Sequence, residues 1–136
     1  MRVRWAFALA ALGAALPAGC GSPPGDLFEV TRSGTIPGAR LVLLVSDGTV
    51  TCNGGEPRAL DGERLLMARE LRRDLEAPAR ARLALAPAPG SVLSYRARLE
   101  PGVLSFSDSS AGRPAALTRL AAFTRDVAKR VCGLAR

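Results

Sequence analysis

The sequence predicts a single α+β domain, in which a five-stranded antiparallel or mixed sheet carries two helices on one face. Residues rich in β-formers occupy two stretches, 27–53 and 91–108, and each stretch is followed by a segment with helical periodicity. Of the 136 residues, 117 remain after removal of an N-terminal signal of 19 residues, which is enough for one hydrophobic core. The predicted element order is therefore βββαββα.

Three strands are predicted in the first stretch. Residues 27–33 alternate in part and are rich in β-formers. Residues 34–38 contain two glycines and a proline and predict a turn. Residues 40–46 form an almost continuous apolar run, typical of a central strand that is packed on both faces or lies under a helix. Asp47-Gly48 then favours a two-residue hairpin turn into a third strand over residues 49–53.

The first helix is predicted over residues 62–77. Asp61 is placed to cap its N-terminus, and Pro78 is expected to end it. Apolar residues recur at steps of three and four along this segment, at Leu65, Ala68, Leu71 and Leu75. Residues 79–90, which contain two further prolines, are predicted to be a connector.

The second stretch predicts a hairpin and the last helix. Residues 91–100 alternate strictly, with Leu93, Tyr95, Ala97 and Leu99 on one face. Pro101-Gly102 fits the central positions of a type II turn, which leads into a partner strand over residues 103–108. Pro114 suits the first position of a helix that runs to about Cys132. Its apolar stripe is Leu117, Leu120, Phe123, Thr124, Val127 and Val131.

The N-terminus predicts export. Arg2 and Arg4 precede an uncharged apolar run, residues 5–16, which is shorter than the ~20 residues of a membrane span and fits a secretory signal. The run ends in Leu-Pro-Ala-Gly before Cys20, a sequence that resembles the lipobox of bacterial lipoproteins. In lipoproteins this cysteine receives a diacylglyceryl group and becomes the new N-terminus. The resemblance therefore implies that membrane lipid attached to Cys20 anchors the protein at the cell membrane or envelope.

These features divide the chain into a signal peptide (1–19), a flexible tether (20–26) and one α+β domain (27–136). The alternative is an ordinary cleaved signal that leaves a soluble secreted protein with a free thiol at Cys20. Lipidation is favoured because it leaves an even number of cysteines in an oxidising compartment.

The two remaining cysteines, Cys52 and Cys132, are predicted to form a disulfide that ties the last helix to the sheet. The alternatives are a reactive thiol pair or half of a metal site. A metal site needs clustered ligands at short spacing, and the chain has no histidine to complete one. We therefore predict neither a metal ion nor a cofactor.

The absence of histidine excludes histidine-based triads and histidine proton shuttles. No lysine is placed to activate the serines as nucleophiles, and no glycine-rich segment has the pattern of a phosphate-binding loop. We predict that the protein is not an enzyme but a non-catalytic domain that binds or modulates a partner in the bacterial cell envelope. A small enzyme of unknown class is the alternative.

The charge is strongly positive, with 19 Lys and Arg against 12 Asp and Glu, and it falls from +7 to +5 when Arg2 and Arg4 are removed. Arg69, Arg72 and Arg73 cluster near the end of the first helix and are a candidate surface for an anionic partner or lipid headgroups. The alternative is a solvated helix face interleaved with acidic residues. Nucleic acid is not expected as a partner of an exported protein with so few aromatic residues.

The loop over residues 35–39, after the first strand, offers a second candidate contact surface, and Thr35 and Ile36 are its candidate residues. Three segments of the chain, residues 30–38, 94–99 and 114–120, also resemble the emfourin family of small inhibitors of thermolysin-like metalloproteases, within a similarity over roughly residues 27–127. The family has a second glycine where this chain has Thr35, and the cysteine pair and the lipobox-like start are further departures. The resemblance implies a protease partner, and it identifies no inhibitory residue. Partner identity and oligomeric state are not encoded in any motif of the chain.

Overall fold

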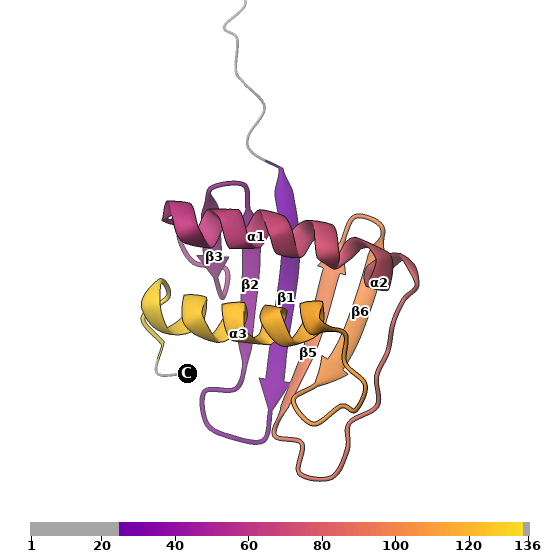
Figure 1. Ribbon diagram of the computed structural model, residues 1–136. Coiled ribbons are helices and arrows are strands. Elements are labelled where there is room, and N and C mark those ends of the chain that lie inside the picture. The colour runs from indigo at the N-terminus through magenta and orange to yellow at the C-terminus, as the bar shows by residue number, and fades with distance from the viewer. Residues whose placement is uncertain (1–24, 135–136) are drawn as a thin grey trace, which may run out of the picture.

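The computed structural model describes residues 25–134, so the predicted signal and Cys20 lie outside the described residues. Within this range the fold is α+β, with a six-stranded sheet and three helices (Figure 1). The elements are β1 (Asp26–Gly34), β2 (Leu41–Ser46), β3 (Thr49–Cys52), β4 (Arg58–Ala59), α1 (Gly62–Asp74), α2 (Glu76–Arg80), β5 (Leu93–Leu99), β6 (Gly102–Ser107) and α3 (Ala115–Arg130). β1 begins at Asp26, the last residue of the predicted tether.

The sheet has the strand order β4-β3-β2-β1-β5-β6, and all five neighbouring pairs are antiparallel. The long strand β1 lies at the centre and joins the β2–β3 hairpin to the β5–β6 hairpin. The outer edge of β6 is covered by the connector, since Leu85 donates its amide to the Ser105 carbonyl at 2.9 Å and Ser105 donates to Leu83 at 2.9 Å. This pairing shields an edge that would otherwise be open to association with another strand.

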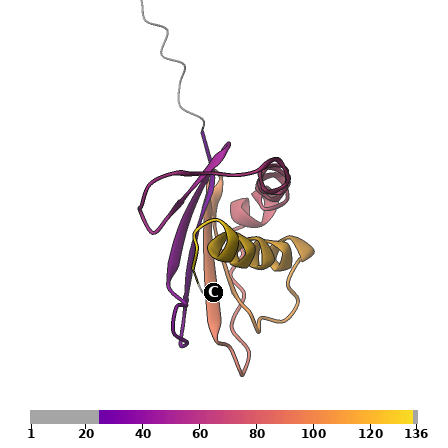
Figure 2. The same ribbon diagram turned by 90° about the vertical axis from the view of Figure 1, so that its left-hand side faces the viewer.

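The helices cover one face of the sheet and leave the other face uncovered (Figure 2). Inward side chains alternate along the strands, as the period of two requires, and meet the buried stripes of α1 and α3. Phe28 of β1 meets Phe123 of α3 edge to face, with ring centroids 6.0 Å apart. The apolar stripe predicted for the last helix is buried from Leu117 to Val127, while Val131 is only half-buried. Burial of this face is the main stabilising contribution to the fold.

The prediction of five strands and two helices is close but incomplete, and the sheet is antiparallel rather than mixed. The missing strand, β4, has only two residues, too few to show a period of two. The missing helix, α2, contains Pro78, which was predicted to stop the first helix. Pro78 is the third residue of α2, in the first turn, where a helix needs no amide donor.

The structure gives Gly102 a different role from the predicted one. Gly102 does not adopt the positive φ that the second central position of a type II turn requires. Instead, a Cβ at this position would lie 2.2 Å from the carbonyl oxygen of Ala79 in α2. Glycine is therefore needed here for the close approach of α2 to the start of β6.

The predicted disulfide is confirmed, because Cys52 of β3 is bonded to Cys132, directly after α3, with 6.0 Å between their Cα atoms. The two cysteines are 80 residues apart in the sequence. The bond therefore fastens the C-terminal end of α3 to the β2–β3 side of the sheet.

Replacing both Cys52 and Cys132 with alanine is expected to lower the free energy of unfolding by up to about 4–5 kcal/mol, because the unfolded chain gains loop entropy. Urea unfolding of the double variant and the parent protein measures this loss. Cys20→Ala is the matched control and should leave stability unchanged. A loss below about 1 kcal/mol in the double variant would contradict a stabilising role for the bond.

Candidate functional site

A buried arginine organises the loop between β1 and β2. Arg32 occupies an inward position of β1, and its side chain is 2% exposed. Its Nε donates to the Ala39 carbonyl at 2.8 Å, and its Nη2 donates to the Gly38 carbonyl at 3.1 Å. Burial lowers the pKa of Arg32, while the neighbouring Tyr95 acts in the opposite direction. Because a buried charge is costly unless it is hydrogen-bonded, these carbonyls hold the guanidinium and the loop together.

Two glycines set the path of the same loop. A Cβ on Gly34 would lie 2.1 Å from the carbonyl oxygen of Val92, which also accepts a hydrogen bond from Thr35 at 3.2 Å. Gly38 has a φ of +75°, in the left-handed region that favours glycine. The end of β1 therefore lies in close contact with the backbone at the start of β5. The β1–β2 loop then turns back over Arg32.

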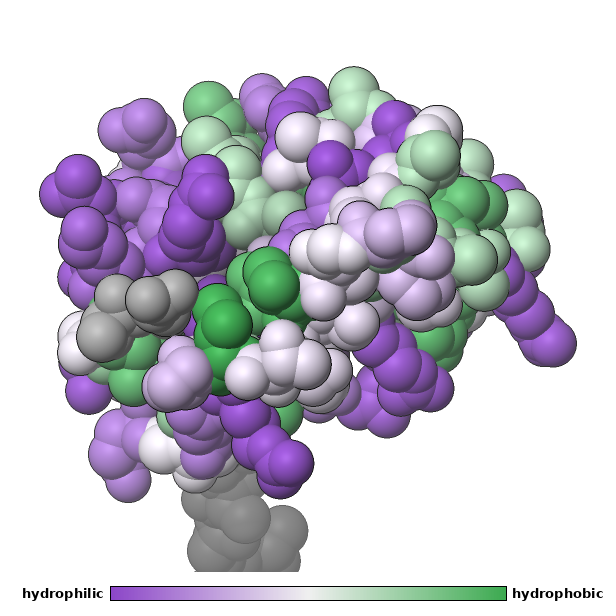
Figure 3. Space-filling model, turned by 90° about the horizontal axis from the view of Figure 1, so that it is seen from below, coloured by the Kyte–Doolittle hydropathy of each residue, from purple (hydrophilic) through white to green (hydrophobic). Residues whose placement is uncertain are grey.

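A pocket of about 240 Å³ lies between this loop, β5 and α3. Its lining residues come from four segments: Arg32, Ile36, Ala39, Leu93, Tyr95, Arg125 and Lys129. Figure 3 shows this end of the molecule, with apolar side chains near the centre and hydrophilic ones around them. The charged residues in the lining are all cations. We refer to it below as the loop pocket.

Tyr95 forms one wall of the loop pocket, and its position is tightly fixed. It lies directly opposite Arg32 on the neighbouring strand and stacks on Phe106, with ring centroids 4.9 Å apart. Burial is the main cause that raises the pKa of Tyr95. Arg32, Arg125 and Arg113 oppose this shift, and Asp108 adds to it. The phenol is therefore neutral at physiological pH and offers a hydroxyl rather than a base.

Asp108 fixes the neighbouring wall of the loop pocket. Its carboxylate accepts the backbone amides of Val92 and Leu93, at 3.2 Å each, and the Ser91 hydroxyl at 3.2 Å. These bonds hold the start of β5 against the end of β6, so that Leu93 keeps its place in the lining. The walls of the pocket are therefore held in place by bonds within the protein.

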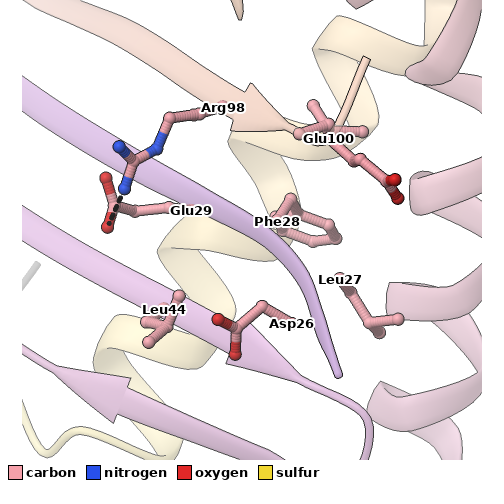
Figure 4. Close-up of a pocket in the computed structure, with 8 residues that line it drawn as sticks. Asp26, Leu27, Phe28, Glu29, Leu44, Arg98 and Glu100 are labelled. Atoms are coloured by element: carbon pink, nitrogen blue, oxygen red, sulfur yellow. Dashed lines mark hydrogen bonds and ion pairs between the residues drawn. The ribbon is translucent and has the colours of Figure 1, made fainter. Parts of the chain in front are cut away.

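In two other hollows the arginines are paired with acidic residues of the protein. Figure 4 shows the first, of about 310 Å³, where Arg98 of β5 pairs with Glu29 of β1 at 3.1 Å. The second, of about 510 Å³, lies between α1 and α3, where Asp126 pairs with Arg64 at 2.7 Å and with Arg130 at 3.2 Å. In contrast, neither of the loop pocket's α3 cations forms an ion pair with a carboxylate among residues 25–134.

The structure separates the two surfaces that the sequence analysis singled out. Thr35 is exposed in the β1–β2 loop, and Ile36 is half-buried and lines the loop pocket. This loop is at the lower end of the sheet in Figure 1, whereas α1, with its arginines, crosses the upper end. The two sets of candidate residues are therefore not brought together in one site.

The arginines of α1 are largely engaged in ion pairs. Arg69 contacts Asp47 of the β2–β3 turn at 2.8 Å, and Arg72 contacts Glu76 at 3.4 Å and Glu100 at 3.9 Å. Arg73 is exposed to solvent. Two of the three arginines therefore have acidic partners, and exposed ion pairs of this kind contribute little to stability.

Sequence reasoning missed all the charged and aromatic residues that line the loop pocket: Arg32, Tyr95, Arg125 and Lys129. The alternation of β1 could have pointed to Arg32. It occupies the next inward position after Phe28 and Val30, where a charged residue is unexpected. The spacing of Arg125 and Lys129 puts them on one face of a helix, but it does not show what that face meets.

The described part of the chain contains no cluster of three or more histidine, cysteine or acidic residues that would hold a metal ion. Its helices are too short or too polar to cross a membrane. Comparison of the chain with protein-family models, curated proteins and solved structures found no match. The loop pocket must therefore be interpreted from its own geometry and charge.

Gly34→Ala is expected to lower the free energy of unfolding by more than about 1 kcal/mol, because its Cβ would overlap the Val92 carbonyl. The matched control is Gly62→Ala at the start of α1, where a Cβ meets no atom within 4 Å. That variant should be neutral or stabilising. Urea unfolding of both variants measures the difference, and equal stability of the two would rule out the close approach of β1 and β5.

Tyr95 is the only tyrosine, and the only tryptophan, Trp5, lies in the predicted signal, so phenolate absorbance reports Tyr95 alone in the mature protein. Its pKa in the folded protein is expected above the unfolded value of about 10. The stability contributed by the buried neutral phenol is then fully present below pH about 10 and is lost as the pH rises through the folded pKa. A spectrophotometric titration with the same midpoint in native and urea-unfolded protein would contradict this environment.

Proposed function

We propose that the protein is a lipid-anchored, non-catalytic binding domain of the bacterial cell envelope. The observation that carries this proposal is the position of the loop pocket at the end of β1 that lies opposite its first residue, Asp26. β1 starts at Asp26, where the tether joins, and ends at Gly34, where the pocket loop begins.

The dimensions of the chain separate the loop pocket from the proposed anchor. Six residue steps join Cys20 to Asp26, so a lipidated cysteine would lie within roughly 20 Å of the start of β1. The nine residues of β1 extend roughly another 25–30 Å to the opposite end of the sheet. The loop pocket lies at this far end, where a ligand or partner in the envelope can reach it.

The chemistry of the pocket supports binding rather than catalysis. Its titratable residues are two arginines, one lysine and a tyrosine whose pKa is raised. Among the described residues that line it, none is an aspartate, glutamate, histidine or cysteine, the side chains that most often act as general bases or nucleophiles. Positive charges beside apolar walls are instead suited to holding an anionic group with an apolar substituent.

A second candidate function is inhibition of a thermolysin-like metalloprotease, as the resemblance to emfourins implies. It is favoured by the exposure of Thr35, Pro37 and Gly38 in a loop that Arg32 clamps through two hydrogen bonds. A rigid exposed loop loses little conformational entropy on binding to a protease cleft. This candidate predicts saturable inhibition of thermolysin-like activity by the purified protein, and undiminished activity at a large molar excess would reject it.

Cys20→Ala is expected to release the protein from the membrane fraction, because the variant has no thiol to acylate. Immunoblotting of fractionated cells measures the distribution. Ser22→Ala, in the same tether, is the matched control and should stay with the membrane. Retention of Cys20→Ala in the membrane fraction after a high-salt wash would overturn the lipid anchor.

A further inference from the structure

We infer that the loop pocket binds a small organic carboxylate, whose charged group lies against Arg125 and Lys129 of α3 and whose apolar tail lies against Ile36, Leu93 and the ring of Tyr95. This inference rests on the proposal that the domain binds a ligand at this end of the sheet. It does not depend on the lipid anchor.

The two cations of α3 that line the loop pocket are in an electrostatically unfavourable arrangement unless an anion binds between them. Arg125 and Lys129 are four residues apart on α3, so their side chains are neighbours on one face of the helix and repel each other. The other arginines at the C-terminal half and the start of α3 have acidic partners, Arg130 with Asp126 and Arg119 with Asp74. A carboxylate between Arg125 and Lys129 would supply the missing negative charge and relieve their repulsion.

The apolar half of the site is fixed before binding. Ile36 is held in a loop that Arg32 clamps, and Leu93 is held by the bond from its amide to Asp108. Tyr95 is stacked on Phe106. Ile36 and Leu93 are half-buried, so each keeps apolar surface that a ligand can cover. A preformed apolar wall beside two cations selects an amphiphilic anion over an inorganic one.

The volume of the pocket limits the ligand to a small molecule. About 240 Å³ is below the range of roughly 300–1,000 Å³ that is typical of sites for drug-sized ligands. A carboxylate with a short aliphatic chain or a single ring fits this space. The Arg32 guanidinium contributes positive potential from the inner end of the site and acts as a positioning residue for the loop.

Two other hollows are less suited to binding a ligand. The hollow between α1 and α3 is lined by the exposed Met67, but its two arginines are already paired with Asp126, and nothing in the structure shows what covers it. The uncovered sheet face carries a hollow of about 330 Å³ rimmed by Leu85 and Pro87, and its occupant is equally undefined. The loop pocket is favoured because it combines a fixed apolar wall with Arg125 and Lys129, which form no ion pair with a carboxylate among residues 25–134.

The test uses the mature protein, residues 20–136, with the Cys20→Ala substitution. This protein is titrated with hexanoate, acetate and inorganic phosphate at constant ionic strength. Using this form removes both the anchor and the need for detergent, so the result is independent of whether the lipid-anchor proposal holds. Hexanoate is expected to bind at least about tenfold more tightly than acetate, because its tail covers apolar surface. In ¹H–¹⁵N spectra the shifts should concentrate in residues 34–40, 93–95 and 125–129.

The matched variants remove one charge each from the same helix. Arg125→Gln and Lys129→Gln should each weaken hexanoate binding about threefold to fivefold, as expected for partly exposed ion pairs. Arg130→Gln, which lines the other hollow, should leave it unchanged. All three positions are exposed, so the variants should keep the fold. The pKa of Tyr95, measured by spectrophotometric titration, checks that the surroundings of the pocket are unchanged in each variant. Bound hexanoate should raise the Tyr95 pKa further, because its charge disfavours the phenolate.

Three results would overturn the inference. Equal affinity for hexanoate, acetate and phosphate would show non-specific attraction to positive charge. Shifts confined to the uncovered sheet face or to α1 would place the ligand elsewhere. Absence of saturable binding of hexanoate up to millimolar concentrations would exclude the site.

Discussion

The docking of α3 across the sheet is the constraint on which the other features depend. Its inner face is buried from Leu117 to Ala128 against the strands. Its C-terminal end is fastened to β3 by the Cys52–Cys132 bond, and Asp126 links it to α1 through Arg64. These three contacts set the position and rotation of the helix. They therefore also set where its outward cations, Arg125 and Lys129, meet the β1–β2 loop.

Arg32 is the second requirement for this site, and it differs from the rest of the core. The inward positions of β1 are filled by Phe28 and Val30 before the strand reaches Arg32, which is buried at the end of the layer. There the guanidinium replaces apolar packing with directed hydrogen bonds to the carbonyls of the loop. A leucine at this position would fill the volume but would leave those carbonyls without their donor. The arginine thus gives the loop a single conformation beside α3.

The sequence was sufficient to predict the elements with a clear period. Strand β5 alternates strictly, and α3 has an apolar stripe over four turns, so local pattern and tertiary burial agree. The short elements β4 and α2 were missed because two and five residues carry no readable period. Pro78 was read as a stop signal, although a helix accepts proline in its first turn.

The site was less predictable, because its charge depends on which basic side chains form ion pairs in the folded protein. Arg69 belongs to a basic cluster in the sequence, yet it pairs with Asp47, which lies 22 residues earlier. Lys129 lies one residue before Arg130, yet only Arg130 has an acidic partner among the described residues. Pairings of this kind follow from the register of the strands and the rotation of the helices. Of the lining residues, Ile36 and Ala39 belong to the loop that was singled out from the sequence.

The loop pocket gives the domain one cationic end with an apolar wall, at the far end of β1 from Asp26. The most direct measurement of this account is an isotope-filtered NOE experiment on labelled protein with unlabelled hexanoate. The account predicts contacts from the aliphatic protons of hexanoate to the Ile36 and Leu93 methyl groups and to the Tyr95 ring. NOEs only to side chains of the uncovered sheet face, or to Leu66 and Met67 on α1, would contradict it.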